Sequence, residues 1–283
     1  MSTAHETVRS AGQSAEGSAG APTPRAVVQV APVAPISLGA GVSGASAKQI
    51  DELMERASAA LVRTDYFDAE SLCLKAMERA VRAQDFDRVS RIIMPLQEAR
   101  RQRRHEAIDA GRVTTMRELS GRGVGAKSKD EGTMQAGCVL IEPPMIGADA
   151  RTVRAIADRK RVAMLVLVRE PTAASGRWPI VAVGGGEFRP AIVRVQVEPP
   201  AGGEITPAWF LATQEALGDA AIAKVKSKWP ADHRVLDLLE YLEGIPDHEK
   251  LHQAVASAAR EAMSRPPTPY PRRRGMFDDP FSF

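Results

Sequence analysis

Apolar residues in the first half of the chain recur every three or four positions, a spacing that predicts amphipathic helices. The first run starts near residue 46 and carries Ile50, Leu53, Met54, Ala57, Ala60 and Leu61. Breaks at Thr64-Asp65 and at Gln84-Asp85 separate it from a second run and from a third run that opens at Phe86. We therefore predict a helical unit of three helices over residues 47–118.

The pattern changes after residue 136 to short apolar runs, which predict strands. These runs cover residues 138–141, 162–168, 180–183 and 191–197, and a helix beginning at Asp149 separates the first two. We expect the first two strands to be parallel and the last two to be added as hairpins. Three further helices are predicted at about 207–225, 232–243 and 247–263. The predicted fold class is α+β: a three-helix unit followed by a mixed four-stranded α/β domain over 137–263 with C-terminal helices.

The remaining segments have compositions typical of disorder or linkers. Residues 1–46 are rich in Ala, Gly, Ser and Pro, residues 119–136 are polar and Gly-rich, and residues 264–283 combine Pro and Arg with Phe. We predict a disordered N-terminal tail, a linker and an extended C-terminal tail. Phe277, Phe281 and Phe283 are unusual in such a tail. They could anchor a protein partner or fold back onto this chain, and both interpretations stay open.

Charge and composition exclude several classes of protein. The 283 residues include 38 Lys and Arg against 35 Asp and Glu, a net charge of +3. Both ordered parts are nearly neutral, with 14 basic and 13 acidic residues over 47–118 and 16 of each over 137–265. Nucleic-acid binding needs concentrated positive charge, so the balance argues against it. Four arginines at positions 100, 101, 103 and 104 are interpreted as partners of a helix C-terminal dipole.

Membrane insertion and secretion are not indicated either. No apolar stretch reaches the roughly 20 residues that a membrane-spanning helix needs. The first thirty residues lack a basic start followed by an apolar stretch, and Cys73 and Cys138 form neither a disulfide framework nor a metal-binding spacing. We predict a cytoplasmic protein.

The second helical run has a small-residue pattern with an aromatic pair at its start. Tyr66 and Phe67 precede Ala69, and Ala76 follows seven residues later. With this pattern, residues 47–108 resemble a tetratricopeptide-type helical hairpin. The resemblance implies a helical array that binds a protein partner. An ordinary helical hairpin packed on the neighbouring domain is the alternative.

The segment His248-Glu249-Lys250-Leu251-His252 matches the H-E-x-x-H pattern and resembles the zincin metalloproteases. On a helix, His248 and His252 lie one turn apart, so both rings could bind one zinc ion while Glu249 acts as the general base. No third ligand follows within the helix. The alternative is a purely structural helix. Leu251 and Val255 begin its apolar face, and both histidines lie at the margin of that face.

Three Glu-Pro pairs, opened by Glu142, Glu170 and Glu198, each follow a predicted strand. If the strands run as proposed, the three carboxylates share one rim of the sheet, where α/β folds usually bind ligands. A ligand or metal site could form there. Alternatively, proline simply ends each strand and the glutamates are solvated.

These patterns favour a protein that works by binding rather than by catalysis. We predict a non-enzymatic protein–protein interaction or scaffold module without a cofactor, with its partner bound by the helical unit or by the phenylalanine tail. One alternative is a zinc-dependent hydrolase that uses His248, Glu249 and His252. The other is a small-ligand or metal site at the glutamate rim.

Overall fold

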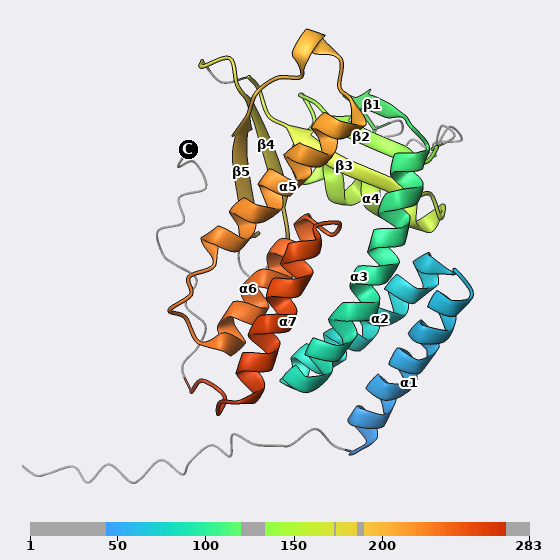
Figure 1. Ribbon diagram of the computed structural model, residues 1–283, viewed down its shortest axis with the longest axis vertical. Helices are drawn as coiled ribbons and strands as arrows, with labels where there is room; N and C mark the ends of the chain where they lie inside the picture. Colours follow the sequence, from blue (N-terminus) through green and yellow to red (C-terminus); the bar gives the residue numbers. More distant parts are fainter. Residues whose placement is uncertain (1–43, 120–133, 173, 186–189, 270–283) are drawn as a thin grey trace, which may run out of the picture. The chain divides into compact units, whose positions relative to one another are not determined.

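The computed structural model describes residues 44–119, 134–172, 174–185 and 190–269. All of these residues belong to one compact unit. Most of the predicted linker, residues 1–43 of the predicted N-terminal tail and residues 270–283 of the predicted C-terminal tail lie outside the described residues, and so do Phe277, Phe281 and Phe283. The described part of the chain has the predicted α+β class (Figure 1).

Seven α-helices and five strands follow one another in the described residues. The helices are α1 (Gly44–Val62), α2 (Tyr66–Arg82), α3 (Phe86–Asp109), α4 (Asp149–Arg159), α5 (Pro207–Lys224), α6 (Ala231–Gly244) and α7 (Glu249–Met263). The strands are β1 (Val113–Met116), β2 (Gly137–Ile141), β3 (Met164–Arg169), β4 (Trp178–Val183) and β5 (Ile192–Val197). A short 3₁₀ turn, Ala201–Gly203, precedes α5.

The two predicted helix breaks are built alike. Thr64 and Gln84 adopt positive φ angles of 61° and 54° and end the preceding helix. The next residue, Asp65 or Asp85, donates its backbone N–H to a carbonyl five residues earlier, at 2.9 Å in both connections. This is the hydrogen bond of a Schellman motif, which satisfies carbonyls that a helix end leaves unpaired. The helical unit α1–α3 therefore contains the same turn twice, 20 residues apart.

The sheet has the strand order β1-β2-β3-β4-β5. β2 pairs with β3 in parallel, and β3–β4 and β4–β5 pair antiparallel, as the sequence predicts. The prediction of four strands was one too few, because β1 pairs in parallel with β2 at the edge of the sheet. Its four residues lie inside the range 47–118 that was predicted to be helical, three residues beyond the end of α3, and pairing with Cys138–Ile141 determines their conformation.

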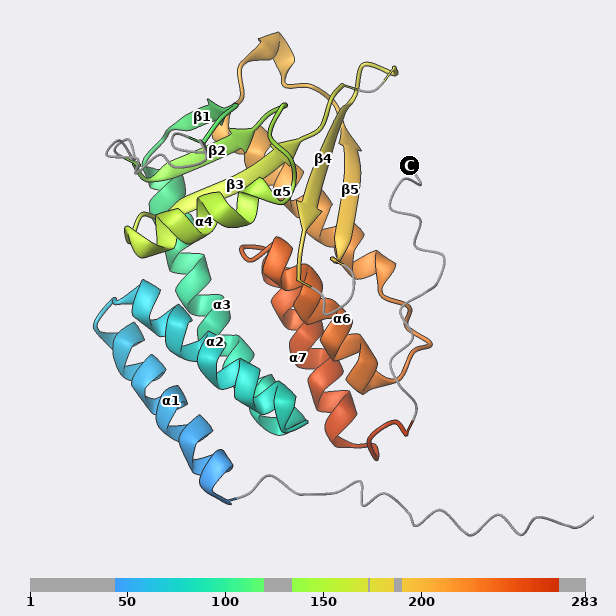
Figure 2. The ribbon, with the colours of Figure 1, turned by 180° about the vertical axis from the view of Figure 1, so that it is seen from behind.

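Helices cover both faces of the sheet, and Figures 1 and 2 show α4 and α5 on opposite sides of it. One face packs against α3, α5, α6 and α7 in a core that includes Leu96, Leu140, Leu165, Phe210 and Val255. The same core continues into α1 and α2, so the helical unit and the sheet share it.

The other face packs against α4 through a smaller cluster that includes Val139, Val153 and Val166. A helix is about 10 Å wide and strands are about 4.8 Å apart, so one helix covers about two strands.

In the described part of the chain, no helix is both long and apolar enough to cross a membrane.

The end of β4 passes very close to the end of α6. A Cβ atom added at Gly184 would lie 1.9 Å from the carbonyl oxygen of Glu240, and one added at Gly244 would lie 2.8 Å from the nitrogen of Gly184. Backbone atoms cannot move aside as a flexible side chain can. The close contact between strand and helix therefore requires glycine at both positions.

Replacing Gly184 with alanine is expected to lower the free energy of unfolding by about 3 kcal/mol, because the new methyl group forces β4 and α6 apart. Urea denaturation of the full chain measures the change. Gly44→Ala is the matched control, since a Cβ added at Gly44 meets nothing within 4 Å. Equal stability of the two variants would show that the contact yields without cost.

Candidate functional site

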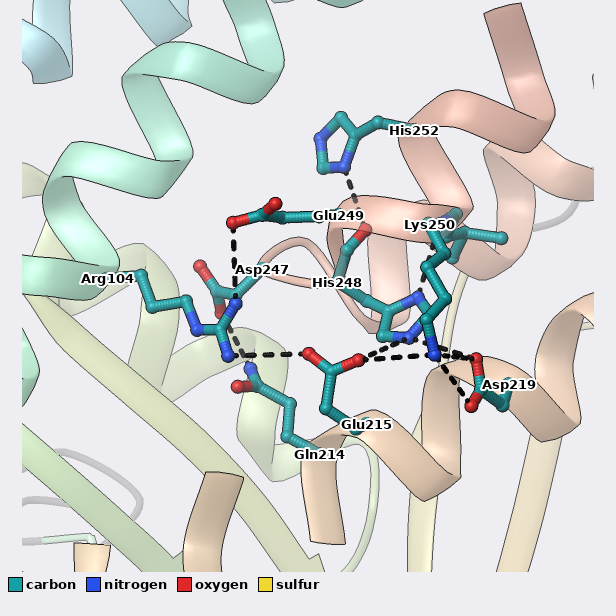
Figure 3. A network of polar contacts seen from close by, with 10 residues as sticks. Arg104, Gln214, Glu215, Asp219, Asp247, His248, Glu249, Lys250 and His252 are labelled. Carbon is teal, nitrogen blue, oxygen red and sulfur yellow. Dashed lines mark hydrogen bonds and ion pairs between the residues drawn. The ribbon is translucent and has the colours of Figure 1, made fainter. Parts of the chain in front are cut away.

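The H-E-x-x-H segment lies at the start of α7, where its first histidine caps the helix. His248 is the N-cap residue, and its Nδ1 accepts the backbone N–H of Leu251 at 3.2 Å. This bond leaves the proton of the neutral ring on Nε2. Nε2 faces two carboxylates of α5 at ion-pair distance, Glu215 at 3.3 Å and Asp219 at 3.5 Å (Figure 3).

Gly218 makes room for this ring on α5. A Cβ atom added there would lie 2.2 Å from the imidazole of His248. Glycine weakens a helix interior, but here it lets the ring pack directly against the helix backbone. The side chain of His248 is consequently fully buried. Desolvation lowers its pKa, although Glu215 and Asp219 oppose that effect.

His252 lies one turn further along α7 and contacts different groups. Its Nδ1 donates to the carbonyl oxygen of His248 at 2.9 Å, and its Nε2 then faces the guanidinium of Arg100 at 3.4 Å. Burial, reinforced by the positive charge of Arg100, lowers the pKa of His252 to about 3. The ring is therefore neutral at physiological pH and accepts from Arg100.

The two histidines and Glu249 do not fit a zinc ion in this arrangement. The lone pair of His248 is on Nδ1 and takes the Leu251 N–H, while the lone pair of His252 is on Nε2 and faces Arg100. Glu249 extends toward Arg104 on α3, and Figure 3 shows the two rings pointing in different directions. Within the described ranges, no three His, Cys, Asp or Glu side chains form a group that could hold a metal ion.

A chain of charges continues from α7 across to α3 and α5. Arg104 donates to Glu215 at 3.3 Å and lies 3.7 Å from Glu249. Lys250 donates to both carboxylate oxygens of Asp219 at 3.0 Å and lies 3.8 Å from Glu215. Glu215 thus stands between the cation of α3 and the cation of α7 (Figure 3).

Glu70 of α2 is the buried anion on the other side of α3. It accepts from Arg100 at 2.7 Å and also pairs with Arg103, which in turn pairs with Asp158 of α4. Burial alone would raise the pKa of Glu70, but the two guanidinium groups outweigh it and hold the pKa below its ordinary value. The carboxylate is therefore charged and compensated.

The loop before α7 adds a second carboxyl group. Asp247 accepts the side-chain amide of Gln214 at 3.3 Å. Desolvation raises its pKa above the ordinary value, although Arg154, Arg103 and Arg100 act in the opposite direction. We call the whole set the charged junction. It comprises Glu70, Arg100, Arg103, Arg104, Asp158, Gln214, Glu215, Asp219, Asp247, His248, Glu249, Lys250 and His252.

Sequence reasoning missed most of the charged junction. The arginines at 100, 103 and 104 do not lie at a helix end, because α3 continues to Asp109, and their partners are side chains rather than the helix dipole. One signal was available. Glu70 and Arg100 both lie on the apolar faces of their helices, between residues that are fully buried. A charge in such a position needs a partner of opposite sign.

The three rim glutamates follow strands that run in the same direction, as expected. Glu142 pairs with Arg117 at 2.9 Å and with Arg169 at 2.8 Å. The other two have separate partners: Glu170 binds Arg194 at 2.9 Å, and Glu198 binds Arg177. The three glutamates thus pair with different arginines, and among the described residues they form no group that could hold a metal ion.

No family model, no curated protein and no solved structure matches the chain.

Proposed function

We propose that this protein is a non-enzymatic scaffold that binds a protein partner through the helical unit α1–α3. The repeated connection between its helices carries the proposal. Both connections join helices that pack against each other, and arrays of stacked helical hairpins present extended surfaces on which partners bind. The charged junction supports this role, because it holds α3 against α5 and α7 and so fixes the helical unit on the sheet.

Exposed apolar side chains on the helical unit indicate where a partner could bind. Val62 of α1, Leu74 of α2 and Met94 of α3 are 84%, 44% and 55% exposed. Leu74 and Met94 each lie nine residues from the connection between α2 and α3, which places them at the same level of that hairpin. We therefore assign partner contact to α2 and α3.

Site-specific photo-crosslinking inside the native cells tests the proposal. A benzophenone amino acid at position 74 or 94 is expected to give an adduct of defined mass with a second protein. The same probe at Glu204, which is exposed and precedes α5, should give none. The change Leu74→Glu together with Met94→Glu should reduce recovery of the complex at least about tenfold, since burying an unpaired charge is costly.

Two results would contradict the scaffold. One is equal labelling from positions 74, 94 and 204, which would mean that the helical unit has no preferred partner. The other is stoichiometric zinc in the purified protein that is lost in a His248→Ala variant. That result would favour the hydrolase alternative, and it would require the start of α7 to rearrange.

A further inference from the structure

The strands β3 and β4 separate after a short paired stretch in the middle of the sheet. Among the described residues, their ladder consists of Val168 with Val181 and Arg169 with Ile180. By contrast, β2 pairs with β3 along its whole length. Figure 2 shows β4 turning away from β3. The sheet is therefore open between the first half of β3 and the end of β4.

Arg154 of α4 reaches into this opening from one face of the sheet. Its Nη2 donates to the carbonyl oxygen of Val166, in the part of β3 that β4 leaves unpaired, at 3.2 Å. Asp247 lies in the loop before α7, a helix that packs on the opposite face. Among the charges that oppose the raised pKa of Asp247, that of Arg154 has the largest effect. The charge of Arg154 thus acts on groups of both faces.

A cavity of about 10 Å³ lies in the same opening. Its wall includes Val166 and Val181 from the apolar cluster under α4, and Leu217 from the larger core on the other side. Arg154 and Gln214 of α5 also line it. One water molecule needs about 10 to 15 Å³ of such space. The cavity therefore has room for a single water molecule.

Two polar atoms of the lining residues are buried and have no partner in the described part of the chain. They are Nε of Arg154 and Oε1 of Gln214. Gln214 is only 3% exposed, and its Nε2 already donates to Asp247 at 3.3 Å. The arginine Nε–H can only donate a hydrogen bond, whereas the amide oxygen can only accept one. A molecule that accepts from the first and donates to the second would satisfy both.

We propose that this cavity binds one water molecule, which accepts from Nε–H of Arg154 and donates to Oε1 of Gln214. Water fits both the volume and the polarity, whereas an anion could accept from Arg154 but could not donate to the amide oxygen. Together with the hydrogen bond between Gln214 and Asp247, this water completes a polar chain from α4 through the sheet to the charged junction. The site does not depend on the scaffold function.

Nuclear magnetic resonance of the full chain in water tests the proposal at the Nε–H group of Arg154, whose signal is identified by its loss in Arg154→Lys. Magnetisation is expected to pass from water to this group with opposite signs in the laboratory-frame and rotating-frame Overhauser experiments. Opposite signs indicate a bound water, whereas proton exchange gives the same sign in both. The Nε–H of Arg100 is the internal control. It is also buried but donates to Glu70 at 2.7 Å, so it should show no transfer.

Variants test the second hydrogen bond of the water. Gln214→Met keeps a side chain of similar shape without the acceptor, so the transfer from water to Arg154 should be lost. Gln253→Met makes the same change at an exposed position of α7 and should leave the transfer unchanged. The melting temperature of Gln214→Met checks that it folds. If it does not fold, the comparison of Arg154 with Arg100 in the parent protein still decides whether the water is bound.

Three outcomes would overturn the proposal. Absence of transfer at Arg154 would mean that the cavity is dry. Equal transfer at Arg154 and Arg100 would mean that water enters the interior without a defined site. Unchanged transfer in a folded Gln214→Met variant would mean that the water does not bridge to α5.

Discussion

Replacing Glu70 with glutamine is expected to lower the free energy of unfolding by about 3 to 5 kcal/mol, the cost of removing one partner from a buried ion pair. Glu70 is only 8% exposed and compensates both Arg100 and Arg103. Glutamine has a similar size but no charge, so Arg100 is left charged in a buried site without a carboxylate. Urea denaturation at neutral pH measures the difference.

The matched control for this change is Glu55→Gln, which alters an exposed glutamate of α1. It should change the stability by less than about 0.5 kcal/mol. A triple variant, Glu70→Leu with Arg100→Met and Arg103→Met, should recover much of the lost stability, because an apolar replacement of the whole cluster leaves no charge uncompensated. If Glu70→Gln were as mild as Glu55→Gln, water would have to reach the junction and solvate its arginines.

As the pH falls, His252 is expected to lower the free energy of unfolding before the carboxylates of the protein become protonated. Burial lowers the pKa of His252 to about 3 in the folded protein, against about 6.5 in an unfolded chain. The unfolded state thus binds a proton that the folded state does not. The stabilising contribution is complete above pH 6.5 and decreases by about 1.4 kcal/mol per pH unit below it, to a loss of about 3 kcal/mol at pH 4.

A comparison with His252→Gln isolates this effect, since other titrating groups are common to both proteins. Arg100 of α3, Glu70 of α2 and the backbone of His248 face the ring, and all three remain in the variant. Between pH 6.5 and 4, the free energy of unfolding of the variant should decrease less steeply than that of the parent protein. The difference in slope should be about 1.4 kcal/mol per pH unit, the value for one proton. His105→Gln changes an exposed histidine of α3 and should keep the parental slope. A parental slope in His252→Gln would mean that the ring is already protonated in the folded protein.

Local signals in the sequence identified most of the elements. The breaks at Thr64-Asp65 and Gln84-Asp85, and the parallel and hairpin order of the later strands, were predicted and are confirmed. β1 was missed because Val113-Thr114-Thr115-Met116 lies only three residues beyond a long helix and is too short to alternate clearly. What makes it a strand is hydrogen bonding to β2, whose first residue comes 21 positions after the end of β1. Sequence spacing carries no information about such a pairing.

The candidate site was predictable only in part, because its chemistry depends on packing. Spacing placed His248 and His252 one turn apart, but not the direction of the rings. His248 is the N-cap rather than a residue within the helix, and that single position redirects its lone pair toward Leu251. The partners of the histidines come from α3 and α5, up to 152 residues away in the chain. Such contacts exist only once the helices are assembled.

The position of α3 has a consequence for the modularity of the chain. This helix packs against α2 on one side and against α7 and the sheet on the other, and its buried residues belong to the same core as Leu140 and Val255. Ala60, Ala69 and Ala99 form a small cluster within the helical unit, but most of its buried apolar residues belong to the core that it shares with the sheet. In isolation, residues 44–109 would expose the side of α3 that α7 and the sheet cover in the full chain. The shared helix thus ties the stability of the helical unit to that of the sheet and its C-terminal helices.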